Sequence, residues 1–266
     1  MKVHIVNTTN IALYGPQLDQ MHRQRKAMFV DRLGWTELDQ GGDYEVDEFD
    51  NEFAHYLLLI DDVGQVLASC RVSPTNQANV SCDKLAEFFD GVPPREEKVW
   101  EVSRWIPAPG VDGLNEICSS MMMLSLFEFG LSRKLDGMIS CVGRIVTRAI
   151  ARAGLPLSSI SPPIRFAQGV AFGIQFETSV ENITRLRRSF RIFKPITIEL
   201  SKALDSNLAL EGMHSSIIDS VLAICDLDIL SEILSDVHSR LVLNMRPTLD
   251  DIRDHMSDVM KGGQFQ

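Results

Sequence analysis

Residues 99–106 read Val-Trp-Glu-Val-Ser-Arg-Trp-Ile, a short stretch that predicts a β-strand. The Pro-Ala-Pro that follows ends the strand, because proline cannot donate a hydrogen bond to a sheet. A strongly apolar segment over 114–133 predicts a buried helix, and residues 138–142 predict the next strand. This part of the chain therefore predicts a strand, a crossover helix and a second strand of one sheet.

The segments on either side extend this sheet. Before it, the pattern predicts a strand over 1–6, a helix over 15–33, strands over 54–61 and 65–72 that form a hairpin, and an irregular stretch over 73–97 with a short helical piece near 85–89. After it, the pattern predicts a helix that ends at 153, a strand over 168–177, a basic helix over 179–190 and a weaker strand over 194–200. We therefore expect an α/β fold with a central mixed sheet and helices on both faces.

The C-terminal part of the chain changes character. Residues 201–262 contain almost no aromatic side chains, and their apolar residues recur with a helical period. We expect a main domain over 1–200 and a helical C-terminal extension over 201–266. The apolar stripes of these helices need a partner surface, which is either the main domain or a second subunit, so a homodimer through the extension is the default expectation.

Composition excludes several classes of protein. The 266 residues are 45% hydrophobic and 23% charged, which is ordinary for a globular protein. No apolar run of 18 residues is present, and the N-terminus turns polar at Asn7, too early for a signal peptide. The five cysteines are odd in number and scattered. We expect a cytoplasmic protein without a membrane span, disulfides or a metal site.

The net charge of −10 hides a basic middle segment. Residues 133–194 carry 11 Lys and Arg against 3 Asp and Glu, whereas both flanking segments are acidic. Such a segment indicates a docking surface for an anionic partner, although a solvated basic face explains it equally well. Nucleic acid is disfavoured because no recognition motif accompanies the charge. An acidic carrier protein or a phosphate-bearing cofactor arm would complement the positive charge of this segment.

Five short motifs in the first 105 residues form a pattern of charged and aromatic side chains. They read Arg25-x-x-x-Phe29, Arg32-Leu33-Gly34-Trp35, Asp47-x-x-Asp50, Arg71-x-x-Pro74-Thr75 and Trp100-Glu101-Val102-Ser103-Arg104. In order and interval this set resembles the acyl-homoserine-lactone synthase (autoinducer synthase) family, and the likeness covers about residues 1–195. The resemblance implies an N-acetyltransferase-like three-layer α/β/α sandwich with a central mixed, mostly antiparallel twisted sheet.

The resemblance also implies a two-step reaction. The amine of S-adenosylmethionine attacks an acyl thioester carried by an acyl carrier protein or by coenzyme A. The methionyl carboxylate then closes the lactone and releases methylthioadenosine, which gives a quorum-sensing signal. S-adenosylmethionine is a substrate here, so no cofactor is implied.

Residue by residue, the resemblance assigns the catalytic set and the S-adenosylmethionine site. Glu101 would handle the amine proton, and Asp47, Asp50, Arg71 and Arg104 would form an ion-pair cluster that shapes the pocket. Arg25, Phe29 and Trp35 would form an N-terminal lid over S-adenosylmethionine. Taken alone, these residues have plainer explanations, namely a strand glutamate facing solvent, a solvated acidic loop and ordinary aromatic packing.

The acyl donor is expected to use two further sets of residues. The acyl-chain pocket would be lined by Ser103, Met121, Met122, Leu124, Met138, Ser140 and Val142, although most of these are equally plausible as plain core. Ser140 matches a position where family members that prefer 3-oxo chains carry threonine. Arg144, Arg148 and Arg152, spaced four apart on one helical face, would receive the acidic carrier protein.

Two other functions are consistent with the same fold. Another acyltransferase of the N-acetyltransferase fold is the first, but the Gly-rich pyrophosphate loop that such enzymes carry before the central helix is absent after Arg104. A non-catalytic binding module is the second, and it has no evident use for so many semi-buried charges. The acyl chain and the donor are left open by the sequence.

Overall fold

The computed structural model describes residues 1–106, 114–166 and 169–200. Every structural statement below refers to these residues. The predicted extension over 201–266, and with it the domain boundary at residue 200 and the dimer through its helices, lies outside the described residues and stays a prediction.

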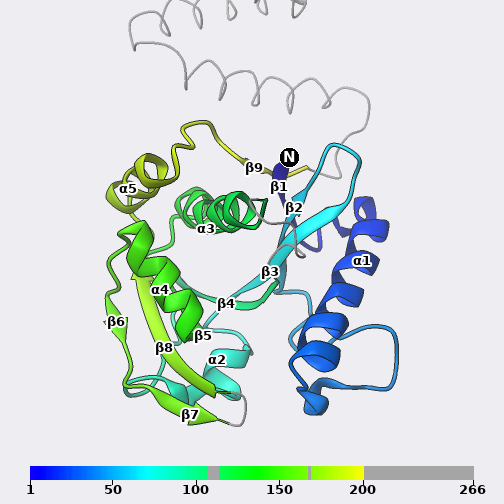
Figure 1. Ribbon diagram of the computed structural model, residues 1–266, viewed down its shortest axis with the longest axis horizontal. Coiled ribbons are helices and arrows are strands. Elements are labelled where there is room, and N and C mark those ends of the chain that lie inside the picture. The colour runs from blue at the N-terminus through cyan, green and yellow to red at the C-terminus, as the bar shows by residue number, and fades with distance from the viewer. Residues whose placement is uncertain (107–113, 167–168, 201–266) are drawn as a thin grey trace, which may run out of the picture. The chain divides into compact units, whose positions relative to one another are not determined.

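The described chain alternates strands and helices in the predicted order (Figure 1). The strands are β1 Lys2–Val6, β2 His55–Ile60, β3 Val66–Pro74, β4 Val99–Ile106, β5 Gly137–Gly143, β6 Ser159–Ile160, β7 Ile164–Phe166, β8 Gly169–Glu177 and β9 Thr197–Ile198. The α-helices are α1 Gly15–Arg25, α2 Val80–Asp83, α3 Leu114–Ser132, α4 Arg144–Ala153 and α5 Val180–Phe190. Three 3₁₀-helices are η1 Ile11–Leu13, η3 Thr36–Leu38 and η4 Ala86–Phe88, and η2 Lys26–Arg32 is a π-helix.

The strands form one sheet in the order β6-β8-β5-β4-β3-β2-β1-β9, with β7 also paired to β8. β4 runs parallel to β5 and β1 runs parallel to β9, whereas the other pairs are antiparallel. The parallel β4–β5 pair requires a crossover, and α3 provides it. The predicted mixed, mostly antiparallel sheet is confirmed.

Helices cover both faces of the sheet. The larger core lies on the α3 face, where α3 packs with Ile150 of α4 and Leu186 of α5 over β-strand residues such as Leu57 and Met138. On the opposite face, Met21 of α1 packs with alternate residues of β1, β2 and β3. Figure 1 shows α3 and α1 on opposite sides of the sheet. The predicted three layers are therefore present, and each strand presents one face to each layer.

Three features differ from the sequence-based expectation. The helix predicted over 15–33 widens into a π-helix at Lys26–Arg32. A single α-helical turn, α2, begins where the side chain of Asn79 accepts a hydrogen bond from the Cys82 amide. The two- and three-residue strands β6 and β7 were not predicted, because strands this short are defined by the β8 edge that they pair with.

Two features are absent from the described residues. No helix among them combines the length and the hydropathy that a bilayer crossing needs. No group of three or more His, Cys, Asp or Glu side chains within the same residues could hold a metal ion.

Candidate active site

Six oppositely charged side chains meet in one buried cluster beside β3 and β4. They are three guanidinium groups and three carboxylates, contributed by Arg25, Arg71, Arg104, Glu45, Asp47 and Asp50. The side chains of Arg25, Arg71, Glu45 and Asp50 are at most 3% exposed, whereas those of Asp47 and Arg104 are each 9% exposed. The cluster is therefore reached from outside through Asp47 and Arg104.

Each of the three arginines bridges a pair of carboxylates, and Arg25 and Arg71 do so with two-pronged contacts. Arg25 donates from Nε to Glu45 at 2.5 Å and from both Nη atoms to Asp50 at 2.8 and 2.9 Å. Arg71 donates from Nη1 and Nη2 to the two oxygens of Asp47 at 2.5 and 3.1 Å, and its Nη1 also lies 2.9 Å from Asp50. Fork-to-fork pairs of this kind fix orientation as well as distance.

Arg104 joins the cluster because β4 contains a bulge. Its Nε and Nη2 lie 3.0 and 2.9 Å from Glu45 Oε1, and its Nη2 lies 2.6 Å from Asp47. The β3–β4 register shifts at this point, and Arg104 has a φ of 51°. An extra residue in one strand turns two successive side chains to the same face. Ser103, which accepts a bond from Arg71 Nε at 3.2 Å, and Arg104 therefore both point into the cluster.

Burial and pairing act in opposite directions on the charges of this cluster. Burial alone would raise the pKa of Asp50, but hydrogen bonds from Arg25 and the charges of Arg25 and Arg71 hold that pKa well below its usual range. Burial likewise acts to lower the pKa of Arg71, but its bond to Asp47 and the nearby carboxylates raise it overall. Pairing therefore favours the charged forms of Asp50 and Arg71 in spite of their burial.

The predicted lid residues lie against this cluster. The rings of Phe29 and Trp35 stack with centroids 5.2 Å apart and an angle of 15° between them. The Arg104 guanidinium lies 5.7 Å from the Phe29 ring centroid, a cation–π arrangement. Trp35 Nε1 is buried and has no hydrogen-bond partner among the described residues. An aromatic pair and an unused N–H donor therefore lie beside the exposed end of the cluster.

Glu101 lies on the same face of the sheet, at the next cross-strand pair. Its residue is 1% exposed, and its carboxylate accepts hydrogen bonds from the backbone N–H groups of Ser81 at 2.5 Å and Val80 at 3.3 Å. Burial raises the pKa of Glu101, while a hydrogen bond from the Ser81 side chain, the charge of Arg71 and the two backbone bonds act to lower it. Glu101 is therefore a buried carboxyl group with a raised pKa, held at the start of α2.

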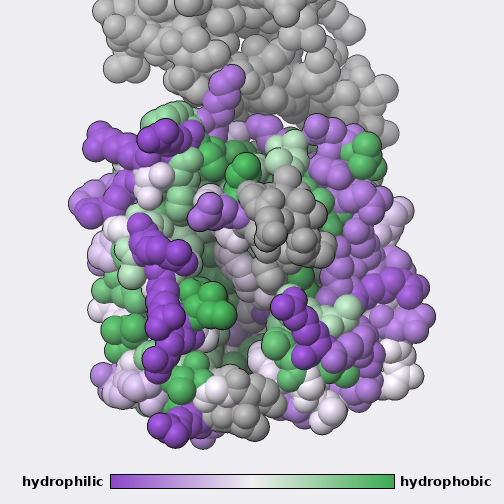
Figure 2. All heavy atoms as spheres, in the orientation of Figure 1, coloured by the Kyte–Doolittle hydropathy of each residue, from purple (hydrophilic) through white to green (hydrophobic). Residues whose placement is uncertain are grey.

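The strands β4 and β5 separate directly after Glu101. Their parallel pairing runs from Val99 to Glu101 only, whereas β4 stays paired with β3 as far as Ile106 and β5 stays paired with β8 as far as Gly143. Ser140 of β5 donates from Oγ to the Val102 carbonyl of β4 at 2.7 Å. Figure 2 shows this side of the domain hollowed between α4 and the α1 side. Beyond Glu101 the backbone groups of β4 and β5 therefore no longer pair with each other.

The predicted acyl-pocket residues fall on two faces. Met121, Met122 and Leu124 of α3, with Met138 and Val142 of β5, pack in the core on the α3 face. Ser140 lies between Met138 and Val142 in the β5 alternation and bonds to β4. Ser103 does not join them: it points to the opposite face, because it lies across from Arg71 in the β3–β4 register. Ser103 therefore lies with the charged cluster, and its assignment to the acyl pocket stays a prediction.

The basic segment gives an exposed row along α4. Arg144, Arg148 and Arg152 are all exposed, and within the described part of the chain no carboxylate forms an ion pair with any of them. Hydrophilic side chains follow α4 down the left side of Figure 2. On α5, by contrast, Arg187 is engaged by Glu128 at 2.8 Å and Arg185 by Glu181 at 3.0 Å. α4 therefore presents three exposed arginines without an ion pair in one row, and Arg188 and Arg191 at the end of α5 are also exposed and without an ion pair among the described residues.

Sequence reasoning missed Glu45. It is fully buried and bonds to both Arg25 and Arg104, so it links the helix α1 to the strand β4. His22 holds its backbone from two sides, since the His22 carbonyl accepts from the Glu45 N–H at 3.2 Å and His22 Nδ1 lies 3.0 Å from the Glu45 carbonyl oxygen. Nothing in the sequence distinguishes Glu45 from the other acids of its loop.

Comparison with known proteins identifies a family. A sequence profile described as autoinducer synthase matches residues 10–186. An acyl-homoserine-lactone synthase of Dickeya dadantii (strain 3937) is 27% identical over 182 residues, which are 64% of this chain and 84% of that protein. One of Pseudomonas aeruginosa is 24% identical over 169 residues, covering 62% of this chain and 84% of that protein.

Solved structures give the same fold. The CoA-dependent acyl-homoserine lactone synthase BjaI, with SAM and isopentyl-CoA, superposes with a TM-score of 0.67 at 21% identity, over 81% of this chain and 99% of that chain. The AHL synthase LasI superposes with a TM-score of 0.60 at 22% identity, over 70% of this chain and 92% of that chain. These likenesses confirm the expected fold. Because the profile spans well over half of the residues, this chain belongs to the autoinducer synthase family.

Proposed function

We propose that this protein is an acyl-homoserine-lactone synthase that acylates the amine of S-adenosylmethionine, lactonises the product and releases methylthioadenosine. One observation carries the proposal: a six-membered charged cluster opens through Arg104 and Asp47 next to the point where β4 and β5 separate. A sulfonium amino acid and a thioester can therefore be held at neighbouring positions. The reaction takes S-adenosylmethionine as a substrate and needs no cofactor.

S-adenosylmethionine is held by charge and by aromatic contact. Its carboxylate matches the guanidinium of Arg104, and its positive groups match the carboxylate of Asp47, because these are the two cluster members with exposed surface. The stacked pair Phe29–Trp35 provides aromatic faces for the adenine ring or the sulfonium. The other four cluster members act as positioning residues, since they hold Arg104 and Asp47 in place.

Acyl transfer requires that the amine be neutral and that the oxyanion be stabilised. Glu101, with its raised pKa, is the group that takes the amine proton, directly or through water. Backbone groups freed where β4 leaves β5 are available to the thioester and its donor arm. Lactone closure then displaces a sulfonium, a good leaving group, so correct positioning supplies most of the acceleration.

The acyl chain extends into the α3 face beside Met121, Met138 and Ser140, and the donor docks on the α4 row. An acidic acyl carrier protein and the phosphates of coenzyme A are both complementary to Arg144, Arg148 and Arg152. BjaI, which shares the fold, is described as CoA-dependent. Either donor places its thioester at the β4–β5 opening.

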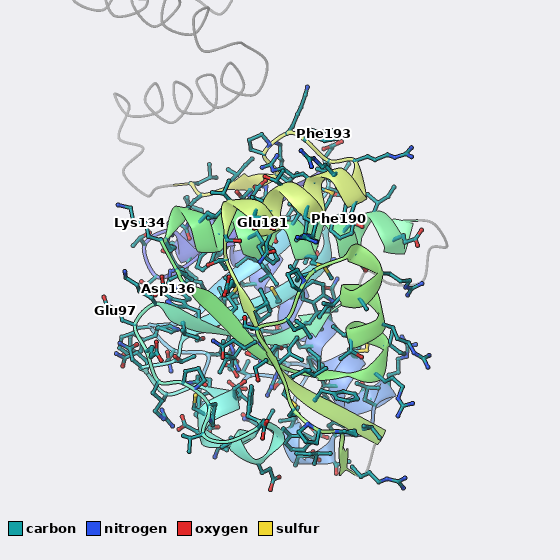
Figure 3. The ribbon with its side chains drawn as sticks, turned by 90° about the vertical axis from the view of Figure 1, so that its left-hand side faces the viewer. Glu97, Lys134, Asp136, Glu181, Phe190 and Phe193 are labelled. Atoms are coloured by element: carbon teal, nitrogen blue, oxygen red, sulfur yellow. The ribbon has the colours of Figure 1, made fainter. Side chains whose placement is uncertain are left out.

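Donor docking is tested by charge reversal. Arg148→Glu with Arg152→Glu should raise KM for the acyl donor and flatten its salt dependence, while KM for S-adenosylmethionine stays the same. Lys134→Glu is the matched control, because Lys134 is exposed and Figure 3 places it across the domain from α4. Equal changes in both variants, or no change, would contradict docking at α4.

The reaction itself is tested by mass spectrometry. The protein is incubated with S-adenosylmethionine and a panel of acyl-CoA and acyl carrier protein donors, and lactone and methylthioadenosine are quantified. Equal amounts of the two products from at least one donor are expected. Glu101→Gln should keep the fold by circular dichroism and lose product. A folded wild-type protein that makes no lactone from any donor would refute the proposal.

A further inference from the structure

Ser73 is a buried serine that faces Glu101. It lies on β3, is 2% exposed, and is the direct cross-strand partner of Glu101 in the antiparallel β3–β4 register. Directly opposed residues on one face have Cβ atoms about 5 Å apart. The next pair on this face, Arg71 and Ser103, makes a hydrogen bond between its side chains, which shows that such pairs are within reach here.

The Ser73 hydroxyl has no hydrogen-bond partner among the described residues. Burying an unpaired hydroxyl is unfavourable, so such a group needs an explanation. Neighbouring polar groups are already engaged: Arg71 with Asp47 and Ser103, and Thr75 Oγ1 with the Val99 carbonyl at 2.7 Å. The carboxylate of Glu101 is the acceptor that the register places opposite.

We propose that Ser73 is a positioning residue for acyl transfer, whose hydroxyl donates a hydrogen bond to the Glu101 carboxylate, either after rotation about χ1 or through one buried water. The bond keeps Glu101 ionised and aimed at the amine. This proposal rests on the proposed function, in which Glu101 takes the amine proton. Ser73 acts on Glu101 and does not touch either substrate.

A hydrogen bond from Ser73 would change the pKa of Glu101, given the groups that surround it. Arg71 on β3 is the charged group that faces it, the Ser81 side chain on α2 bonds to it, and the thiols of Cys82 on α2 and Cys141 on β5 also lie near it. Burial raises the pKa of both thiols, that of Cys141 to about 12, so they carry no charge at neutral pH. A donor to the ionised carboxylate lowers its pKa. Loss of the Ser73 hydroxyl therefore raises the pKa of Glu101 and reduces the ionised fraction at a given pH.

The experiment compares two variants of equal shape, Ser73→Thr and Ser73→Val, of which only the first keeps a hydroxyl. The rate of lactone formation is measured from pH 5.5 to 9 at saturating S-adenosylmethionine. For Ser73→Val we expect a loss in kcat of about ten-fold at pH 7, an acidic limb displaced to higher pH, and KM for S-adenosylmethionine within about two-fold of wild type. Ser73→Thr should follow the wild-type profile.

Ser69→Ala is the matched control. Ser69 lies on the same strand, is 1% exposed and also has an unpartnered hydroxyl, but its partner across β4 is Ile106. Its profile should coincide with that of wild type. The inference is overturned when Ser73→Val keeps the wild-type profile, or when Ser73→Thr and Ser73→Val lose the same factor at every pH. A wild-type protein that forms no lactone refutes the proposed function instead, so the two failures are distinguishable.

Discussion

Replacing Glu45 by glutamine tests how far the charged cluster depends on one buried carboxylate. Glu45 is 0% exposed and accepts one bond from Arg25 and two from Arg104. The three arginines and three carboxylates balance in charge, so Glu45→Gln leaves the cluster with one uncompensated positive charge. The amide N–H₂ of the new glutamine also faces a guanidinium, so that one hydrogen-bond donor faces another.

The expected effect on stability follows from burial. Removing one partner of a buried ion pair lowers the free energy of unfolding by 3–5 kcal/mol in typical cases, and glutamine keeps one acceptor, so we expect about 3 kcal/mol. For a domain of this size each kcal/mol changes Tm by about 2–4 °C, so Tm should fall by about 6–12 °C. Because Arg104 loses its support, KM for S-adenosylmethionine should rise at least about ten-fold.

Urea denaturation and thermal melting at pH 7 measure the first effect, and initial rates of methylthioadenosine release measure the second. Glu48→Gln is the control from the same loop: Glu48 is 63% exposed and pairs at 3.0 Å with Lys84, itself 59% exposed. Such a surface pair contributes at most about 1 kcal/mol. Equal losses of stability in the two variants would refute the reasoning, and so would an unchanged KM in Glu45→Gln.

Three further predictions concern acid stability, backbone packing and acyl selectivity. Pairing with Arg25 and Arg71 depresses the pKa of Asp50, so the stability that this carboxylate contributes is complete above its unfolded pKa of about 4 and is lost as pH falls through the lower folded pKa. The free energy of unfolding should therefore fall less steeply with decreasing pH in Asp50→Asn than in wild type. Identical pH slopes of the two proteins would contradict this. Gly173→Ala places a Cβ 2.7 Å from the Phe89 ring and should lower the free energy of unfolding by about 2 kcal/mol, whereas Gly42→Ala, with no atom within 4 Å, should change it by less than about 0.5. Ser140→Ala should change the ratio of kcat/KM between 3-oxo and unsubstituted donors about five-fold, and an unchanged ratio would exclude a contact with the 3-substituent.

The sequence was most informative where the period of the side chains is regular. The strand predicted over 99–106 coincides with β4, and the prolines that follow it in the sequence define its end. The apolar helix over 114–133 likewise coincides with α3 to within one residue. A long element with one buried face can be predicted from sequence, since each buried apolar position repeats the same period.

The parts that could not be predicted depend on tertiary contacts. Period-two alternation puts Ser103 and Arg104 on opposite faces, and only the bulge with φ of 51° at Arg104 brings them together. Glu45 is one of several acids in a polar loop, which reads as solvated until three-dimensional contacts with Arg25 and Arg104 bury it. No sequence pattern indicates that the buried hydroxyl of Ser73 lacks a hydrogen-bond partner.

Binding of S-adenosylmethionine, measured by isothermal calorimetry, tests the central claim most directly. The account predicts saturable 1:1 binding to the wild-type protein and a loss of at least about ten-fold in affinity in Arg104→Ala, because the exposed guanidinium of the cluster takes the methionyl carboxylate. Arg133→Ala, which removes an arginine paired with Glu199 outside the cluster, should bind as wild type does. Equal affinities in all three proteins, or no binding to the wild type, would contradict the assignment of the cluster as the S-adenosylmethionine site.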